Sequence, residues 1–238
     1  MNNPTCRLIN PTKTEMGNVS KQILDRVNDA IRSSTSVNQW RNSSSVINWF
    51  KNIQDKPRHR FISFDIVNFY PSISEPLLRK SLEFAKQYTE IPARDIDIIM
   101  HSRKSLLFDN MEPWVKRENK HMFDVTMGSY DGAEVCELVG LYILNILGQK
   151  YDKEQIGLYR DDGLGAFKNI SGGEAERIKK GITKVFSDLG LKITIETNLR
   201  VVNFLDITLN LSDGKYYPYR KPNDRPVYVH KQSNHPGV

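Results

Sequence analysis

Hydrophobic and polar positions along the chain follow two periods, and each period predicts a different kind of element. Apolar residues that recur every three or four positions predict amphipathic helices. Six segments have this character, and the fifth, which is apolar on most sides, predicts a buried helix. The first helix would be capped by Asn18 or Ser20 and carries Ile23, Val27 and Ile31, and the third would be capped by Ser74 and run to Ala85. The second, fourth, fifth and sixth are expected at residues 46–53, 93–104, 133–147 and 174–189.

Short runs of β-branched and aromatic residues predict strands between these helices. The first run, Phe61–Val67, places Phe61, Ser63 and Asp65 on one face and the apolar residues between them on the other. Residues 157–167 predict a hairpin with Asp162-Gly163 as its turn, and residues 106–108 and 121–125 predict the arms of a longer hairpin. Residues 33–45 predict a loop, and later strands are expected at 192–196, 201–209, 215–219 and 227–230. The irregular alternation predicts an α+β fold, an antiparallel sheet backed by helices.

Composition narrows the class of protein without identifying it. The 238 residues are 39% hydrophobic and 26% charged, which is typical of a folded globular protein. The longest apolar stretch is about half the length that a bilayer span requires, and the N-terminus carries no secretory pattern. Two cysteines without a CxxC pair indicate neither a disulfide framework nor a zinc site. We therefore expect an intracellular protein of the nucleus or cytoplasm, without membrane association.

Charge is distributed unevenly along the chain. The net charge is +6 over residues 1–60, −4 over residues 61–170 and +4 over residues 171–238. Basic flanks favour a polyanion such as a nucleic acid, because phosphates supply a strong, sequence-independent attraction. An acidic centre would repel the same polyanion unless cations neutralise it. A mildly basic protein with no such partner would show the same net charge.

The stretch "GLYRDDGLGAF" contains two adjacent carboxylates, Asp161 and Asp162, and Asp65 ends a strand 96 residues before the first of them. If the two segments are neighbours in one sheet, three carboxylates meet at one edge. Like charges at about 4 Å repel by roughly 4 kcal/mol at an effective dielectric near 20, so such a cluster requires cations. Hard oxygen ligands favour two Mg²⁺ ions, with Mn²⁺ as the alternative, and two such ions catalyse nucleotidyl displacement. A polar turn remains the alternative for the Asp-Asp-Gly sequence taken alone.

Three segments together resemble motifs of reverse transcriptases. The segment "FDIVNFYPSI", 64–73, resembles the first catalytic motif, with an aspartate that ends a strand and an aromatic residue five positions later. The segment "MGSYDGAEVCELVG", 127–140, resembles the loop and helix that support template and nucleotide, although many relatives carry a Ser-Pro pair there. The segment "LYRDDG", 158–163, resembles the Tyr-x-Asp-Asp box. Their order and spacing imply the right-hand polymerase palm.

Flanking segments extend the resemblance over most of the chain. The segment 5–10 resembles a fingers strand, and 191–196, 202–209 and 219–236 are most similar to reverse transcriptases of Penelope-like retroelements. By this resemblance the chain lacks the start of the fingers, a complete thumb and an endonuclease domain. The implied division is 1–60 as partial fingers, 61–206 as palm with a fingers insertion around 85–126, and 207–238 as the primer-grip region and the start of the thumb.

The resemblance assigns the catalytic ligands. Asp65 and Asp161 would bind both metal ions, and the backbone carbonyl of Ile66 would be a further ligand. Asp162 would be the supporting carboxylate. The implied function is RNA-directed DNA synthesis, with an RNA template, a DNA primer and dNTPs as partners. Two alternatives stay open: a catalytically inactive or domesticated fragment that binds nucleic acid, and an RNA-dependent RNA polymerase.

The resemblance also implies residues that contact substrate. Tyr70 would stack below the nucleotide sugar and exclude a 2′-hydroxyl, and Gly128 and Ser129 would form the loop beneath the nucleotide. Arg7 would pair with the triphosphate as a planar fork. Lys192 is the nearest candidate for a proton donor to pyrophosphate.

The last implied contact is with the primer. Phe204 and Leu205 would lie near the hairpin that grips the primer end. By pattern alone, both are ordinary core residues.

Overall fold

A five-stranded sheet forms the centre of the protein. The computed structural model describes residues 13–104, 107–109, 112–114 and 123–221. Neighbouring strands are antiparallel, except that the first two in spatial order are parallel. In that order the strands are β1 Asn38–Gln39, β5 Ile156–Tyr159, β6 Asp162–Lys168, β2 His59–Ile66 and β7 Ile193–Leu199.

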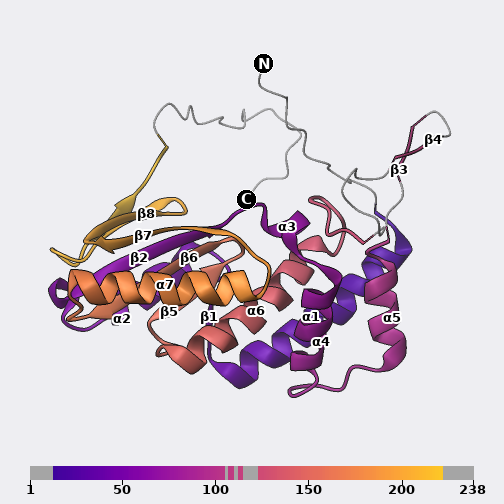
Figure 1. The fold of residues 1–238 in the computed structure, drawn as a ribbon, viewed down its shortest axis with the longest axis horizontal. Helices are drawn as coiled ribbons and strands as arrows, with labels where there is room; N and C mark the ends of the chain where they lie inside the picture. The colour runs from indigo at the N-terminus through magenta and orange to yellow at the C-terminus, as the bar shows by residue number, and fades with distance from the viewer. Residues whose placement is uncertain (1–12, 105–106, 110–111, 115–122, 222–238) are drawn as a thin grey trace, which may run out of the picture.

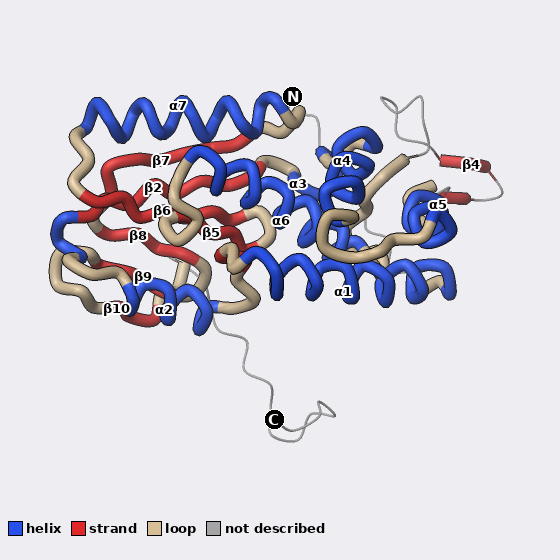
Figure 2. The backbone as a smooth tube through the Cα atoms, turned by 90° about the horizontal axis from the view of Figure 1, so that it is seen from below, coloured by secondary structure: helices blue, strands red, loops and turns tan. Residues whose placement is uncertain are grey.

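Helices surround this sheet unevenly. Figures 1 and 2 show α7 lying along the sheet, while α1, α4 and α5 gather beyond one end of it. The α+β class expected from the sequence, a largely antiparallel sheet backed by helices, is confirmed. The helices are α1 Glu15–Thr35, α2 Ser43–Asn52, α3 Phe69–Ser72, α4 Glu75–Ala85, α5 Ala93–His101, α6 Gly132–Lys150 and α7 Gly172–Asp188, with a short 3-10 turn at Lys56–Arg58.

The two faces of β2 belong to two different cores. Ile62, Phe64 and Ile66 are buried in the larger core with residues of α6 and α7, and the Phe64 ring lies 5.4 Å from the ring of Phe186. Phe61 points to the opposite face and packs in a smaller core with residues of α2 and the later strands. The alternation predicted for this strand is therefore confirmed, because each face of the sheet is covered by its own apolar layer.

Side chains cap the starts of α1, α2, α4 and α7, and the cap of α1 differs from the prediction. Ser74 caps α4 as expected, by accepting a hydrogen bond from the Leu77 amide at 3.3 Å. The prediction for α1 was wrong, because Thr14, and not Asn18 or Ser20, caps it by accepting from the Gly17 amide at 3.0 Å. Ser20 is fully buried within the helix.

The prediction of one strand over 201–209 was also wrong. Two strands occupy this segment and reverse at Leu205, whose φ of 54° lies in the left-handed region. A separate three-stranded sheet results, in the order β10-β9-β8, with bounds β8 Val201–Phe204, β9 Ile207–Asn210 and β10 Tyr216–Pro218. The expected loop at 33–45 likewise contains β1, which pairs with β5 too briefly to leave a sequence pattern.

Segment 105–125 pairs differently from the prediction. The short strand β3 Leu107–Asp109 pairs with β4 Glu112–Trp114, and of the expected partner segment 121–125 only residues 123–125 are described. Closing the shorter loop loses less chain entropy. Phe123 instead forms a single bridge with Lys104. The strand expected at 227–230 lies outside the described residues.

The expected division into fingers, palm and primer-grip segments stays a prediction. The central sheet takes β1 from residues 1–60, and the β8–β9 hairpin spans the boundary at 206. Among the described residues, no helix is long and apolar enough to cross a membrane.

Candidate active site

The hairpin formed by β5 and β6 turns two residues earlier than predicted. Tyr159 pairs with Asp162, so the turn consists of Arg160 and Asp161, and Arg160 adopts a φ of 52°. Gly163 lies within β6, where an added Cβ would stand only 2.0 Å from the ring of Phe64. The glycine is needed because an aromatic ring of the neighbouring strand covers it, and not because the chain reverses there.

The register of β2 and β6 brings the predicted carboxylates to one edge of the sheet. Asp65 lies directly opposite Asp162 in the antiparallel ladder. The amide of Ile66 donates to the carbonyl oxygen of Asp161 at 2.9 Å, which fixes the turn beside the end of β2. Three carboxylates from distant parts of the sequence therefore meet at the end of two paired strands.

The carboxylates of this edge repel one another. Partial burial raises the pKa of Asp65, and the charge of Asp161 raises it further. The pKa of Asp162 is raised to about 6, chiefly by burial and then by repulsion from Asp161 and Asp65, while Lys221 opposes the rise. Burial and the neighbouring charge thus disfavour the ionised forms of Asp65 and Asp162 unless positive charge is supplied.

The chemistry of these donors fits a hard divalent cation, since all three are carboxylates. Within the part of the chain that the structure describes, no three His, Cys, Asp or Glu side chains stand close enough to hold a metal ion. Binding of an ion would therefore have to draw the carboxylates together. The carbonyl of Ile66 as a further ligand stays a prediction.

A groove of about 420 Å³ connects the carboxylate edge to the smaller sheet. Asp65 and Asp162 lie at one end, and the predicted primer-grip residues Phe204 and Leu205 line it as well. Phe204 is buried, with its ring 5.5 Å from that of Trp40, and Leu205 forms the reversal between β8 and β9. The structure thus brings the expected primer-grip hairpin to the same groove as two of the carboxylates.

Tyr70 and the loop before α6 are not among the residues that line this groove. Tyr70 is half-buried in α3, and burial is the main reason why its pKa is raised to about 12, with smaller contributions that include Cys136 and Asp161. A Cβ added at Gly132 would stand 3.5 Å from the Tyr70 ring, so the start of α6 contacts this tyrosine. The predicted loop residues are close by in sequence: Gly128 has a φ of 87°, and Ser129 donates to the carbonyl of Thr126 at 2.8 Å.

Of the two remaining predicted site residues, Lys192 lies within the described part of the chain and Arg7 does not. Lys192 is exposed, and its carbonyl accepts a hydrogen bond from the Val67 amide at 2.8 Å, which places it near the end of β2. Its role as a proton donor stays a prediction. Arg7 lies outside the described residues.

Two charged residues near the site were missed by sequence reasoning. Glu196 lines the groove, and the alternation of β7 could have indicated it, because Ser63 is its register partner on β2. Lys221 acts on Asp162 from a segment whose only sequence signal is its basic composition.

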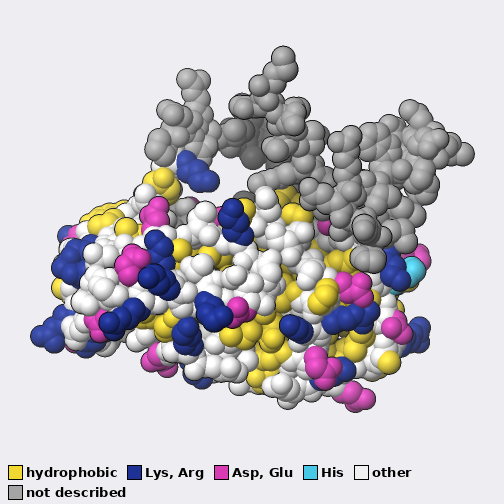
Figure 3. Space-filling view, in the orientation of Figure 1, with side chains coloured by type: hydrophobic (Ala, Val, Ile, Leu, Met, Phe, Trp, Pro, Cys, Tyr) yellow, Lys and Arg dark blue, Asp and Glu magenta, His cyan; other side chains and the backbone are white. Residues whose placement is uncertain are grey.

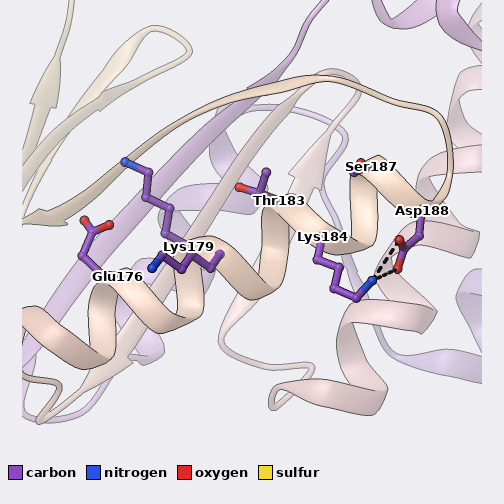
Figure 4. A pocket seen from close by; sticks show the side chains of 7 residues that line it. Glu176, Lys179, Thr183, Lys184, Ser187 and Asp188 are labelled. Atoms are coloured by element: carbon purple, nitrogen blue, oxygen red, sulfur yellow. Dashed lines mark hydrogen bonds and ion pairs between the residues drawn. The ribbon is translucent and has the colours of Figure 1, made fainter.

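A second depression, of about 430 Å³, lies along the outer side of α7 and contains none of the predicted site residues. All of its lining side chains come from this one helix, and Lys184 pairs there with Asp188 at 3.1 Å (Figure 4). On this face of the molecule, Lys and Arg side chains are interspersed with acidic and apolar ones (Figure 3). It is a furrow along an exposed helix surface, and the groove at the carboxylates is the better candidate for a site.

No known protein-family model matches the sequence, and no curated protein does. Solved structures do match. Apo telomerase from Candida tropicalis superposes with a TM-score of 0.65 at 13% identity, over 85% of this chain and 40% of that one. Telomerase from Candida albicans, in complex with a fragment of telomeric RNA, gives 0.59 at 14% identity, over 86% and 39%.

A viral polymerase gives a TM-score close to that of the Candida albicans telomerase. The RNA-dependent RNA polymerase of a human picorbirnavirus gives a TM-score of 0.58 at 14% identity, over 84% of this chain and 40% of that one. The chain therefore spans about two fifths of the length of these three proteins. At such identities the likeness shows the fold alone. The chain therefore has an α+β fold similar to that of part of these telomerases and of this viral polymerase.

Proposed function

We propose that this chain is the catalytic palm of an RNA-directed DNA polymerase, which transfers a nucleotide from a dNTP to a primer 3′-hydroxyl. The observation that carries the proposal is the pairing of β2 with β6. It sets Asp65 opposite Asp162 and ties Asp161 to the end of β2, on a polymerase-like fold. A polar turn alone would not explain why a third carboxylate lies at the same edge.

Two Mg²⁺ ions bound there would activate the primer hydroxyl and stabilise charge on the triphosphate and pyrophosphate. The protein's own contribution is positioning. Asp65 and Asp161 would hold the ions, and Asp162 would support them. The groove would hold the primer end against the β8–β9 hairpin, and the Tyr70 ring would lie under the sugar of the nucleotide.

The proposed partners are an RNA template, a DNA primer and dNTPs. Support for RNA comes from the similar Candida albicans telomerase, whose structure contains telomeric RNA, and from the basic flanking segments of this chain. An origin in a retroelement of the Penelope-like type is part of the proposal and rests on the sequence resemblance.

An RNA-dependent RNA polymerase is the second candidate, because a viral enzyme of this class has a similar fold. Tyr70 separates the two candidates. A half-buried ring that packs against the start of α6 is suited to exclude a 2′-hydroxyl, which an RNA polymerase must accept. Extension with dNTPs but not with NTPs favours reverse transcription, and the reverse result favours the second candidate.

The test is primer extension on an RNA template with Mg²⁺, comparing the unmodified protein, Asp161→Asn and Asp188→Asn. Asp188 is a matched control, because it is an exposed aspartate on α7 that pairs with Lys184. We expect Asp161→Asn to abolish extension while its unfolding curve stays cooperative, and Asp188→Asn to extend normally.

Undiminished extension by Asp161→Asn would overturn the assignment of the site. A protein that binds primer-template with a steep salt dependence, yet extends with neither dNTPs nor NTPs in Mg²⁺ or Mn²⁺, would instead be the inactive nucleic-acid-binding fragment.

A further inference from the structure

Among the residues that the structure describes, the most deeply buried charges belong to one ion pair, which lies away from the carboxylate edge. The side chains of Arg103 and Asp131 are each only 1% exposed, and the Arg103 guanidinium donates to the Asp131 carboxylate. Ser20 of α1 and Ser102 also donate to this carboxylate, the latter at 3.1 Å. Asp131 therefore joins the ends of α1, α5 and α6 in one polar cluster.

Stability does not explain why this pair is retained. Removing two charges from water generally costs about as much as their attraction returns, and well-packed apolar residues often serve as well. In addition, the Nε and Nη1 atoms of Arg103 are buried without a hydrogen-bond partner in the described part of the chain. The buried pair is better explained by the segments of the chain that it holds in position.

Arg103 holds both ends of one loop. Its carbonyl oxygen accepts a hydrogen bond from the Asp124 amide at 2.9 Å, and its guanidinium binds Asp131 seven residues later. Between these points lie Gly128 and Ser129, the predicted loop beneath the nucleotide. Two backbone hydrogen bonds close turns in this segment. The Ser129 amide donates to the Thr126 carbonyl at 3.1 Å, and the Gly132 amide donates to the Ser129 carbonyl at 3.2 Å.

The end of this loop contacts the proposed sugar gate. A Cβ at Gly132 would stand 2.5 Å from Ser129 Oγ, 3.0 Å from the Thr126 carbonyl and 3.5 Å from Tyr70 Cε1. A side chain at Gly132 would thus clash with the loop itself and would stand at van der Waals distance from the Tyr70 ring. A shift of Asp131 would move Gly132, the residue that follows it, against or away from this ring.

We infer that Arg103 and Asp131 are positioning residues, which clamp the loop 124–131 and through Gly132 set the place of Tyr70 for nucleotide selection. This inference rests on the proposed function. It assigns to the pair no contact with substrate. Its consequence is that loss of the clamp relaxes discrimination between ribonucleotides and deoxyribonucleotides and weakens nucleotide binding more than it slows turnover.

The first test replaces the pair by apolar residues, Arg103→Met with Asp131→Leu, so that no unpaired charge stays buried. The matched control is Arg26→Met with Asp95→Leu, which removes a surface pair of 2.8 Å that also joins α1 to α5. For the folded clamp variant we expect the dNTP KM to rise about tenfold with kcat less affected, and the preference for dNTPs over NTPs to fall by a similar factor. The control should match the unmodified protein.

A second measurement needs no activity and keeps the test decisive if the double variant folds poorly. Ser20→Ala with Ser102→Ala removes two hydrogen bonds to Asp131 and leaves both charges in place. Amide hydrogen exchange of segment 124–132 should become at least tenfold faster in this variant, with exchange in β2 unchanged.

The outcomes separate the two claims. Unchanged exchange in the loop, or a folded clamp variant whose KM and sugar preference stay within twofold of the unmodified protein, would overturn the clamp. An unmodified protein that extends no primer would overturn the proposed function, and the exchange measurement would then decide the clamp by itself.

Discussion

The carboxylate edge and the Arg103–Asp131 cluster handle negative charge in opposite ways. At the cluster, the chain supplies its own cation, and the aspartate is saturated with donors and almost fully buried. At the edge, three carboxylates meet, and among the described residues it is the exposed Lys221 that opposes the raised pKa of Asp162. The comparison indicates that the charge of Asp131 is neutralised by a residue of the described chain, while the carboxylate edge is suited to receive cations from solution.

Deleting one partner of the buried pair should produce the largest change in stability. Arg103→Met leaves Asp131 buried without its counter-ion, and we expect a loss of about 3 to 5 kcal/mol in the free energy of unfolding. Urea denaturation followed by circular dichroism measures it, with Arg26→Met as the control on the exposed pair. A loss below about 1 kcal/mol, as surface pairs give, would remove the contrast between the two regions.

Tyr70 lies where the two regions meet, since it contacts the start of α6 and is coupled to Asp161. Tyr70→Val should open space below the sugar and lower the preference for dNTPs over NTPs by about tenfold or more, the range in which small changes of pocket volume act. Competing incorporation of the two nucleotide types on one template measures this. An unchanged preference would mean that the tyrosine is a half-buried core residue only.

At the carboxylate edge, removing a charge should stabilise the protein. The folded-state pKa of Asp162 is about 6, above that of the unfolded chain, so ionisation lowers stability as the pH rises from about 4 through 6. Asp162→Asn should therefore raise the free energy of unfolding by about 1 kcal/mol at pH 8 without divalent ions, after allowance for solvent screening. The gain should vanish near pH 4.

Urea denaturation at both pH values checks this, with the exposed Asp97→Asn on α5 as the control. Destabilisation by Asp162→Asn at pH 8 in the absence of metal would show that the edge is already compensated, as the buried cluster is.

Much of the fold could be predicted from local patterns. The alternation in 61–67 predicted both faces of β2, because each face packs against its own core. Ser74 indicated the start of α4, since capping depends on residues only three positions apart. The α1 start and the break at Leu205 were missed, because several polar residues compete for the cap and because a left-handed leucine leaves no pattern.

The residues of the site were likewise predictable in kind but not in arrangement. The sequence indicated the three aspartates but placed the hairpin turn at Asp162 and Gly163. The turn lies at Arg160 and Asp161 instead, and Gly163 belongs to β6, where the Phe64 ring covers it. Arg103 gave no signal, because an arginine that follows a helix is usually solvated and only its distant partner makes it exceptional.

The sequence by itself determined the α+β class, the amphipathic faces and the adjacent carboxylates Asp161 and Asp162, because these depend on residue type and short-range spacing. Only the tertiary structure decided that Asp65 lies opposite Asp162, that the β8–β9 hairpin closes the same groove, and that Arg103 reaches Asp131. Each of these depends on strand register and long-range packing, which bring together residues that no local pattern connects.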